Sequence, residues 1–466
     1  MPPRGIGARF MALGGGEAAA RLAAFAATVY LARTLSPAMY GIVGVAMGVM
    51  LYLTQLADGG IELVGVPLVA RNRGRLAELA EPILSLRFVA SIVLALVVVA
   101  AGLTVLPQPD GAVMASSALA LAFTGLSVRW IHLGFERAGE IAVSRTLGEA
   151  VALLAIVLLV HGAGDVGHVP LAQFIGAAVT AMVLLATLQR RGHRLRWRWD
   201  PVAARPVFAR SRHLIVFTLL GLLLFNFDLI YLRLRSGAAA AGYYAAAYTM
   251  VAFAANLIVA FAHTVLPTLS RLEGEREERE ALFTTACAQA FAIALPVGVG
   301  AWYISAQVVG EIFGAAYLPG VVALQWLAWS IPLAALRELP VVALIAAGEE
   351  RELLRVNAIA AGCNVALVVA AVPRWGLEGA AAATLATELI RLGLAAHYAR
   401  RAGYPVVPPR RLYKATLASA AMAAALIILA PRSLLGSVPL GGAIYGAVLV
   451  LVGGFALRGR TPVLSV

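Results

Sequence analysis

Long apolar stretches repeat along the chain and are separated by short polar turns. A helix that crosses a bilayer needs about 20 mostly apolar residues. The breaks between stretches carry turn residues, as in the segment PQPDG at 107–111. The pattern predicts an all-α polytopic membrane protein with about fourteen transmembrane helices. Their expected ranges are 13–33, 39–58, 80–106, 111–133, 139–161, 168–189, 213–233, 242–267, 282–305, 319–346, 352–373, 377–399, 412–430 and 438–457. The span 319–346 contains Pro332 and Pro340, so we expect it to tilt or break there.

The loop at 190–212 is the most basic of the chain and divides the first twelve spans into six and six. This arrangement predicts two six-helix lobes around a central cleft, as in many secondary transporters. The expected parts are an N-terminal lobe at 1–190, a basic cytoplasmic linker at 191–212 and a C-terminal lobe at 213–400. Two appended helices occupy 401–466.

Composition and charge support the membrane prediction and set an orientation. The chain is 61% hydrophobic and 13% charged, whereas soluble domains are about half apolar and about a quarter charged. If the N-terminus is cytoplasmic, most of the 37 Lys and Arg residues fall in inner loops. We therefore expect both termini to be cytoplasmic, and the net charge of +13 needs no nucleic acid to explain it.

Motifs that would indicate an enzyme are absent from the sequence. It contains no P-loop, no GxSxG or HExxH pattern and no cluster of cysteine and histidine, and its predicted outer loops are short. The sequence therefore favours a gradient-driven transporter over an enzyme. It predicts no metal site and no cofactor, apart from a coupling proton or sodium ion.

Ionisable side chains predicted at bilayer depth are the candidate functional residues, because charge there is costly and usually has a purpose. A guanidinium matches phosphate in a bidentate manner, so the arginines are predicted to contact an anionic lipid-linked substrate. The acids are predicted to bind the coupling ion. The arginines are Arg21, Arg337 and Arg391, and the acids are Asp228, Glu338 and Glu388.

Mutual neutralisation of these charges is the alternative interpretation. Glu388 and Arg391 are three residues apart, and Glu17 and Arg21 are four apart, so each pair lies on one helical face. Both interpretations, substrate contact and ion pairing, stay open at this point.

Several short motifs resemble those of a transporter family. They are LARTLSPAMYG at 31–41, LADGG at 56–60, NFD at 226–228, AGYYAAAY at 241–248, LPTLS at 266–270 and GLEGAA at 376–381. In this order and spacing, the chain resembles the polysaccharide-export flippases. These form the Wzx-like branch of the multidrug/oligosaccharidyl-lipid/polysaccharide (MOP) exporter superfamily.

The resemblance implies that two lobes open alternately and flip a polyprenyl-pyrophosphate-linked oligosaccharide across a bacterial cytoplasmic (inner) membrane. It also implies a cationic cleft and coupling to an ion gradient. Asp228 matches the aspartate of the family's motif in the seventh span, at 213–233, and is therefore implied as a coupling residue. The expected partners are this glycan substrate and membrane lipids, together with polysaccharide polymerase and glycosyltransferases. A cation-coupled multidrug or small-solute antiporter of the same superfamily is the main alternative, and a membrane enzyme or accessory assembly subunit is a third.

Overall fold

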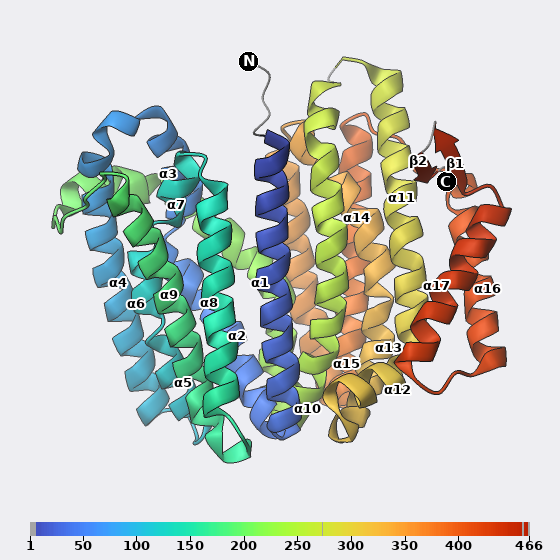
Figure 1. The fold of residues 1–466 in the computed structure, drawn as a ribbon, viewed down its shortest axis with the longest axis horizontal. Helices are drawn as coiled ribbons and strands as arrows, with labels where there is room; N and C mark the ends of the chain where they lie inside the picture. The colour runs from blue at the N-terminus through green and yellow to red at the C-terminus, as the bar shows by residue number, and fades with distance from the viewer. Residues whose placement is uncertain (1–5, 273, 459–460, 465–466) are drawn as a thin grey trace. The chain divides into compact units, whose positions relative to one another are not determined.

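The computed structural model describes residues 6–272, 274–458 and 461–464, and the chain divides into two compact units (Figure 1). The units are Met1–Asn226 and Phe227–Val466. The boundary falls inside a long helix, α10 (Pro201–Arg271), which belongs to both units. Each unit is a helical bundle with its own buried residues.

The described residues of the first unit form nine α-helices, two short 3-10 helices at Arg73–Arg75 and Ala163–Gly167, and the beginning of α10. Helix α8 packs against both α1 and α9, and small residues such as Gly148 and Gly176 allow the close approach of α8 and α9. The helices are α1 (Ile6–Thr34), α2 (Pro37–Asp58), α3 (Ile61–Arg71), α4 (Leu76–Thr104), α5 (Asp110–Ala118), α6 (Leu121–Leu126), α7 (Arg129–Gly134), α8 (Ala138–Leu159) and α9 (His168–Arg190).

Local chemistry sets the ends of α2. The Ser36 hydroxyl accepts a hydrogen bond from the Met39 N–H at 3.3 Å, and Pro37 stands in the first turn; both are typical of a helix N-terminus. At the other end, Gly59 and Gly60 have φ values of 63° and 70°, which favour glycine. The chain therefore leaves α2 and enters α3 directly.

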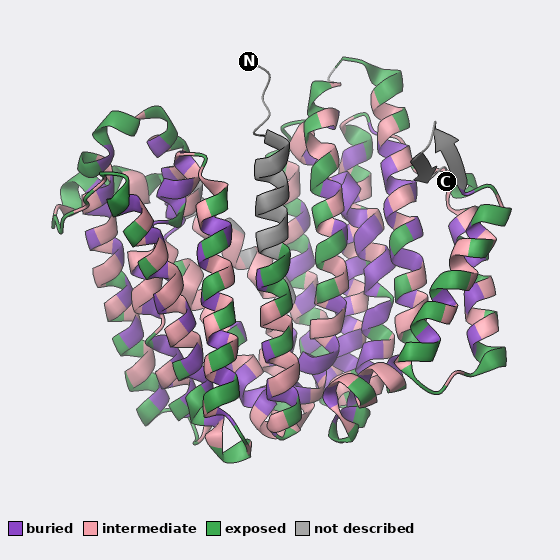
Figure 2. Ribbon diagram, in the orientation of Figure 1, coloured by how far each residue is buried: buried purple, intermediate pink, exposed green. Residues whose placement is uncertain are grey.

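The second unit begins with the remainder of α10 and ends in a small hairpin. Buried residues are concentrated along α13, α14 and α15 (Figure 2). Within Ala315–Ala346, 72% of an apolar stretch of 18 residues is buried. This segment is therefore the centre of the second unit. The elements are α11 (Arg276–Tyr303), α12 (Ser305–Val308), α13 (Val321–Ala328), α14 (Ser330–Ala346), α15 (Glu350–Arg401), α16 (Tyr413–Leu429), α17 (Leu434–Leu451), β1 (Phe455–Arg458) and β2 (Thr461–Leu464).

The described helices account for every predicted span. Ten helical segments are long and apolar enough to cross a membrane by length and composition. Gly237 in α10 and Gly376 in α15 have non-helical dihedral angles and divide each long helix into two spans. Helices α1 and α16 correspond to the first and thirteenth predicted spans. The expectation of a polytopic helical membrane protein is confirmed.

Three local features differ from the sequence prediction, and the break in the tenth span refines it. Helix α3, with 11 residues, lies where the sequence predicted a loop. It was not predicted because it is too short to span a membrane. The predicted basic linker is helical from Pro201. The break in the tenth span lies at Trp329, because Pro332 has no N–H to donate to the carbonyl four residues earlier. The antiparallel hairpin of β1 and β2 adds the strands that the all-α prediction lacked.

Replacement of Gly237 by alanine is expected to destabilise the protein. Its φ of 89° and ψ of 175° lie in a region that is essentially restricted to glycine, where another residue costs about 1–3 kcal/mol. Thermal unfolding of the purified protein in detergent should show a lower midpoint for Gly237→Ala. The control is Gly393→Ala, since a Cβ on helical Gly393 meets nothing within 4 Å. An unchanged midpoint for Gly237→Ala would contradict the expectation.

Candidate functional site

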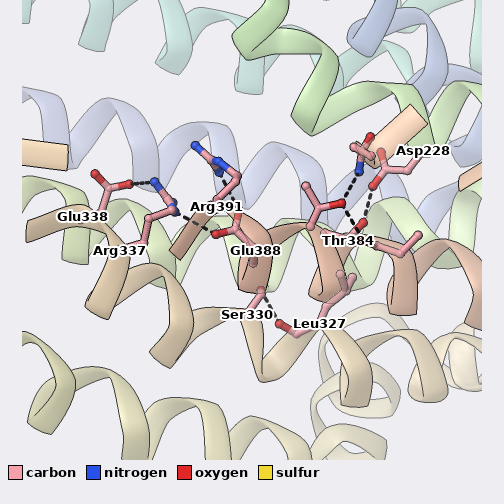
Figure 3. Close-up of polar contacts among 11 residues, drawn as sticks. Asp228, Leu327, Ser330, Arg337, Glu338, Thr384, Glu388 and Arg391 are labelled. Carbon is pink, nitrogen blue, oxygen red and sulfur yellow. Dashed lines mark hydrogen bonds and ion pairs between the residues drawn. The ribbon is translucent and has the colours of Figure 1, made fainter. Parts of the chain in front are cut away.

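Four charged side chains form one buried chain of ion pairs in the second unit (Figure 3). Arg337 Nη1 lies 2.6 Å from Glu338 Oε1, and Arg337 Nε lies 2.9 Å from Glu388 Oε2. The other Glu388 oxygen, Oε1, lies 2.7 Å from Arg391 Nη1. We call Arg337, Glu338, Glu388 and Arg391 the ionic chain. Its two positive and two negative charges cancel.

The ionic chain joins α14 to the second half of α15. All four residues are at most 8% exposed, and removal of two opposite charges from water is repaid only by good geometry and further hydrogen bonds. Glu388 meets this condition, because each of its oxygens accepts from a different arginine. Glu388 is therefore the central residue of the chain.

Asp228 lies in a second polar cluster of the same unit (Figure 3). Its carboxylate accepts hydrogen bonds from the Tyr244 hydroxyl, from Thr384 Oγ1 at 2.9 Å and from the Leu229 N–H at 2.8 Å. Tyr244 and Thr384 also lie within hydrogen-bonding distance of each other, at 3.0 Å. Among the described residues Asp228 has no ion-pair partner, so its charge is met by neutral donors alone. We call Asp228, Tyr244 and Thr384 the aspartate cluster.

Helix α15 connects the two clusters. Thr384, Glu388 and Arg391 are spaced by four and three residues, so they follow one another along a single helical face. Thr384 belongs to the aspartate cluster and the other two belong to the ionic chain. A shift of this helix face therefore affects both clusters together.

The first unit contains a separate polar cavity of about 550 Å³. Two acid–arginine pairs stand in its wall: Arg87 Nη2 with Asp58 Oδ1 at 2.8 Å, and Arg129 Nη1 with Glu62 Oε1 at 2.6 Å. Arg87 also donates to the carbonyls of Thr124 and Ser127. We call this space the polar cavity, and its lining residues are Thr54, Gln55, Asp58, Glu62, Arg87, Phe123, Thr124, Ser127, Arg129, Arg145, Glu149, Ala177, Thr180, Ala181, Leu184 and Thr218.

The structure brings some of the predicted site residues together and leaves others apart. Arg337, Glu338, Glu388 and Arg391 form the ionic chain, whereas Asp228 lies in the aspartate cluster. Arg21 belongs to the first unit, where its side chain on α1 is exposed, and the side chain of Glu17 lies outside the described residues. Substrate binding by the arginines and ion coupling by the acids stay predictions.

Other polar residues of these sites were missed by the sequence analysis. Arg87 was not among the candidate residues predicted from the sequence, but it is 1% exposed and lies within α4. Its partner Asp58 is 29 residues away, so no helical spacing reveals the pair. Thr384 could have been predicted from the sequence, because it stands four residues before Glu388 and therefore lies on the same helical face.

Comparison with protein families agrees with this architecture. Residues 6–273 match the family model described as polysaccharide biosynthesis protein. The chain belongs to this family. The resemblance inferred from the motifs is thereby confirmed. A search of curated proteins found no match.

Solved structures with the same fold include transporters of the MOP superfamily. The lipid II flippase MurJ, in an inward closed conformation, gives a TM-score of 0.77 at 13% identity, covering 94% of this chain and 98% of MurJ. An inward-facing multidrug resistance MATE family transporter gives 0.66 at 16% identity, over 82% and 94%. A MOP superfamily transporter from Pyrococcus furiosus gives 0.59 at 17% identity, over 84% and 94%. At these identities the likeness concerns the fold.

Replacement of Glu388 by glutamine should destabilise the second unit strongly. The change leaves two buried arginines without their shared carboxylate, and loss of one partner from a buried ion pair costs about 3–5 kcal/mol. Glu338→Gln should have a smaller effect, because Arg337 keeps Glu388. Thermal unfolding in detergent measures both.

The matched control for this series is Glu352→Gln, also on α15. Glu352 pairs with Arg355, and the two side chains are 23% and 61% exposed. Such partly exposed pairs contribute about 0–1 kcal/mol. A midpoint for Glu388→Gln equal to that of Glu352→Gln would show that the ionic chain does not stabilise the fold.

Proposed function

We propose that the protein flips a polyprenyl-pyrophosphate-linked oligosaccharide from the inner to the outer leaflet of the bacterial cytoplasmic membrane, by alternating access. The observation that carries the proposal is the family match over residues 6–273. The polar groups support it, because they lie in helical bundles whose described residues include ten helical segments long and apolar enough to span a membrane. Membrane lipids are the surroundings of this reaction, and polysaccharide polymerase and glycosyltransferases are its proposed partners.

An apolar cavity in the second unit supports a lipid-linked substrate. It has a volume of about 500 Å³ and lies between α10, α11, α13, α14 and the α16–α17 pair. Phe253, Met422 and Leu426 are among the residues that line it. Burial of an isoprenoid chain against such a surface is favourable by about 25 cal/mol per Å² of apolar area.

In this proposal the ionic chain releases its arginines to the pyrophosphate. Phosphate oxygens present the same bidentate geometry to a guanidinium as a carboxylate does. Arg337 and Arg391 therefore exchange Glu388 for phosphate in one conformation and return to it in another. Arg21 is the proposed contact from the first unit.

Asp228 is the proposed coupling residue. It is 0% exposed, and its two hydroxyl partners, Tyr244 and Thr384, can each turn from donor to acceptor. The aspartate cluster therefore accommodates either protonation state without movement of heavy atoms. The buried acid is also what a cation-coupled drug antiporter requires, so that activity is the second candidate.

Reconstituted vesicles test the function and the coupling together. A glycosidase added outside cleaves only glycans in the outer leaflet, so flipping raises the cleavable fraction of a polyprenyl-pyrophosphate-linked oligosaccharide. An imposed proton or sodium gradient should accelerate this rise for the wild type. For Asp228→Asn, the rate with a gradient should equal the rate without one.

Glu278→Gln is the control for the coupling test, because Glu278 is exposed and forms no hydrogen bond or ion pair among the described residues. A gradient response that persists in Asp228→Asn would remove Asp228 from the coupling site. A wild type that moves no lipid-linked glycan but exports a small organic cation would favour the antiporter.

Cysteine labelling tests the proposed orientation. In a background in which Cys287 and Cys363 are replaced by alanine, a membrane-impermeant maleimide should label Arg432→Cys in intact spheroplasts. Arg194→Cys should be labelled only after permeabilisation, because the basic loop is expected to be cytoplasmic. Both original side chains are exposed, and the reverse labelling pattern would invert the orientation.

A further inference from the structure

We propose that the polar cavity binds uncharged sugar residues of the substrate glycan. This inference rests on the proposed function, since it assigns one part of a lipid-linked glycan to one place in the first unit. It differs from the proposed role of the arginines in the ionic chain, which concerns the pyrophosphate.

The charges in the wall of the polar cavity cancel. Asp58, Glu62 and Glu149 face Arg87, Arg129 and Arg145. Two of the pairs are closed by direct contacts, and Arg129 donates to both oxygens of Glu62, at 2.6 and 2.8 Å. A ligand with several negative charges would need surplus positive charge in the wall, and the lining has none. The balance therefore favours a ligand without net charge.

Uncharged polar side chains in the same wall have no partner in the described part of the chain. These are the hydroxyls of Thr54, Thr124 and Ser127 and the amide of Gln55, all of which line the cavity. Polar groups that line a cavity normally find a hydrogen-bond partner in protein, water or ligand. The wall therefore offers an array of hydrogen-bonding groups that the protein itself does not use.

A sugar ring matches this array. Each of its hydroxyls both donates and accepts, as do the side chains of serine and threonine, and an amide offers two donors and a carbonyl acceptor. The charged pairs add stronger hydrogen bonds, because Glu62 accepts from and Arg129 donates to a hydroxyl. Phe123, held edge-on against Phe174 with ring centroids 4.9 Å apart, adds an apolar surface for the carbon face of a ring.

The size of the cavity agrees with this class of ligand. Its volume of about 550 Å³ lies within the range of roughly 300–1,000 Å³ that is typical of sites for small organic ligands. A smaller cavity of about 280 Å³ shares Glu149, Ala177 and Thr180 with it. The two cavities thus offer neighbouring spaces for successive sugar rings.

Binding by the full-length protein in lipid nanodiscs tests the assignment. The probes are N,N′-diacetylchitobiose, which is uncharged, a disaccharide that contains glucuronic acid, and inorganic pyrophosphate. Saturation-transfer NMR titrations should show the tightest binding for the uncharged disaccharide. Gln55→Leu and Thr124→Val should each weaken it roughly 2- to 10-fold, as expected for one lost hydrogen bond.

A change of cavity charge gives a second readout that a folding defect does not imitate. Glu62→Gln leaves the exposed Arg129 without its carboxylate, so affinity for the glucuronic disaccharide should rise roughly five-fold relative to the uncharged one. Glu78→Gln is the matched control, because it opens an exposed pair with Arg75 away from the cavity. Thr104→Val and Gln189→Leu, both outside the lining, control for the two polar-to-apolar changes.

Several outcomes would overturn the inference: no binding of the uncharged disaccharide, tighter binding of pyrophosphate or glucuronate by the wild type, or unchanged binding by Gln55→Leu and Thr124→Val. The vesicle assay distinguishes a failure of the sugar assignment from a failure of the proposed flipping. Flipping by the wild type together with any of these outcomes removes only the sugar assignment. Disaccharide binding as expected, without flipping of any lipid-linked glycan, removes only the proposed flipping.

Discussion

A charged side chain within the hydrocarbon layer must find its counter-charge inside the protein, because no water is present to solvate it. The ionic chain satisfies this requirement for four residues at once. Since Arg337 on α14 and Arg391 on α15 share one carboxylate, a slide of either helix by one turn would separate them. The ion pairs therefore fix the register of these two helices.

The two units meet the same requirement in different ways. In the second unit the Arg337 side chain is 6% exposed, so its charges are used to position helices. In the first unit the Arg129 side chain is 46% exposed beside a cavity, so its charge remains accessible to another molecule. Burial thus distinguishes polar groups that are closed off by their ion pairs in this structure, such as Arg337, from those that are open to a ligand in it, such as Arg129.

Sequence alone predicted the spans well, because the length of an apolar stretch is a local property. It also placed Glu388 and Arg391 on one face from their spacing. It did not predict the pair of Arg337 with Glu388, which are 51 residues apart, or that of Arg87 with Asp58. Tyr244 stands in the motif at 241–248 but was not predicted as a site residue, because a hydroxyl in an apolar helix has no distinctive pattern until its partner is known. Pairing across helices depends on packing, which no periodicity encodes.

The neutrality of the ionic chain has an electrical consequence. The membrane potential does work on net charge, about 2.3 kcal/mol for each elementary charge carried across 100 mV. Two arginines and two glutamates that move together carry none, so the membrane voltage neither drives nor opposes their displacement. Asp228 has no ion-pair partner among the described residues, and its displacement in the ionised form would be sensed by the field. Protonation would make that movement electrically silent.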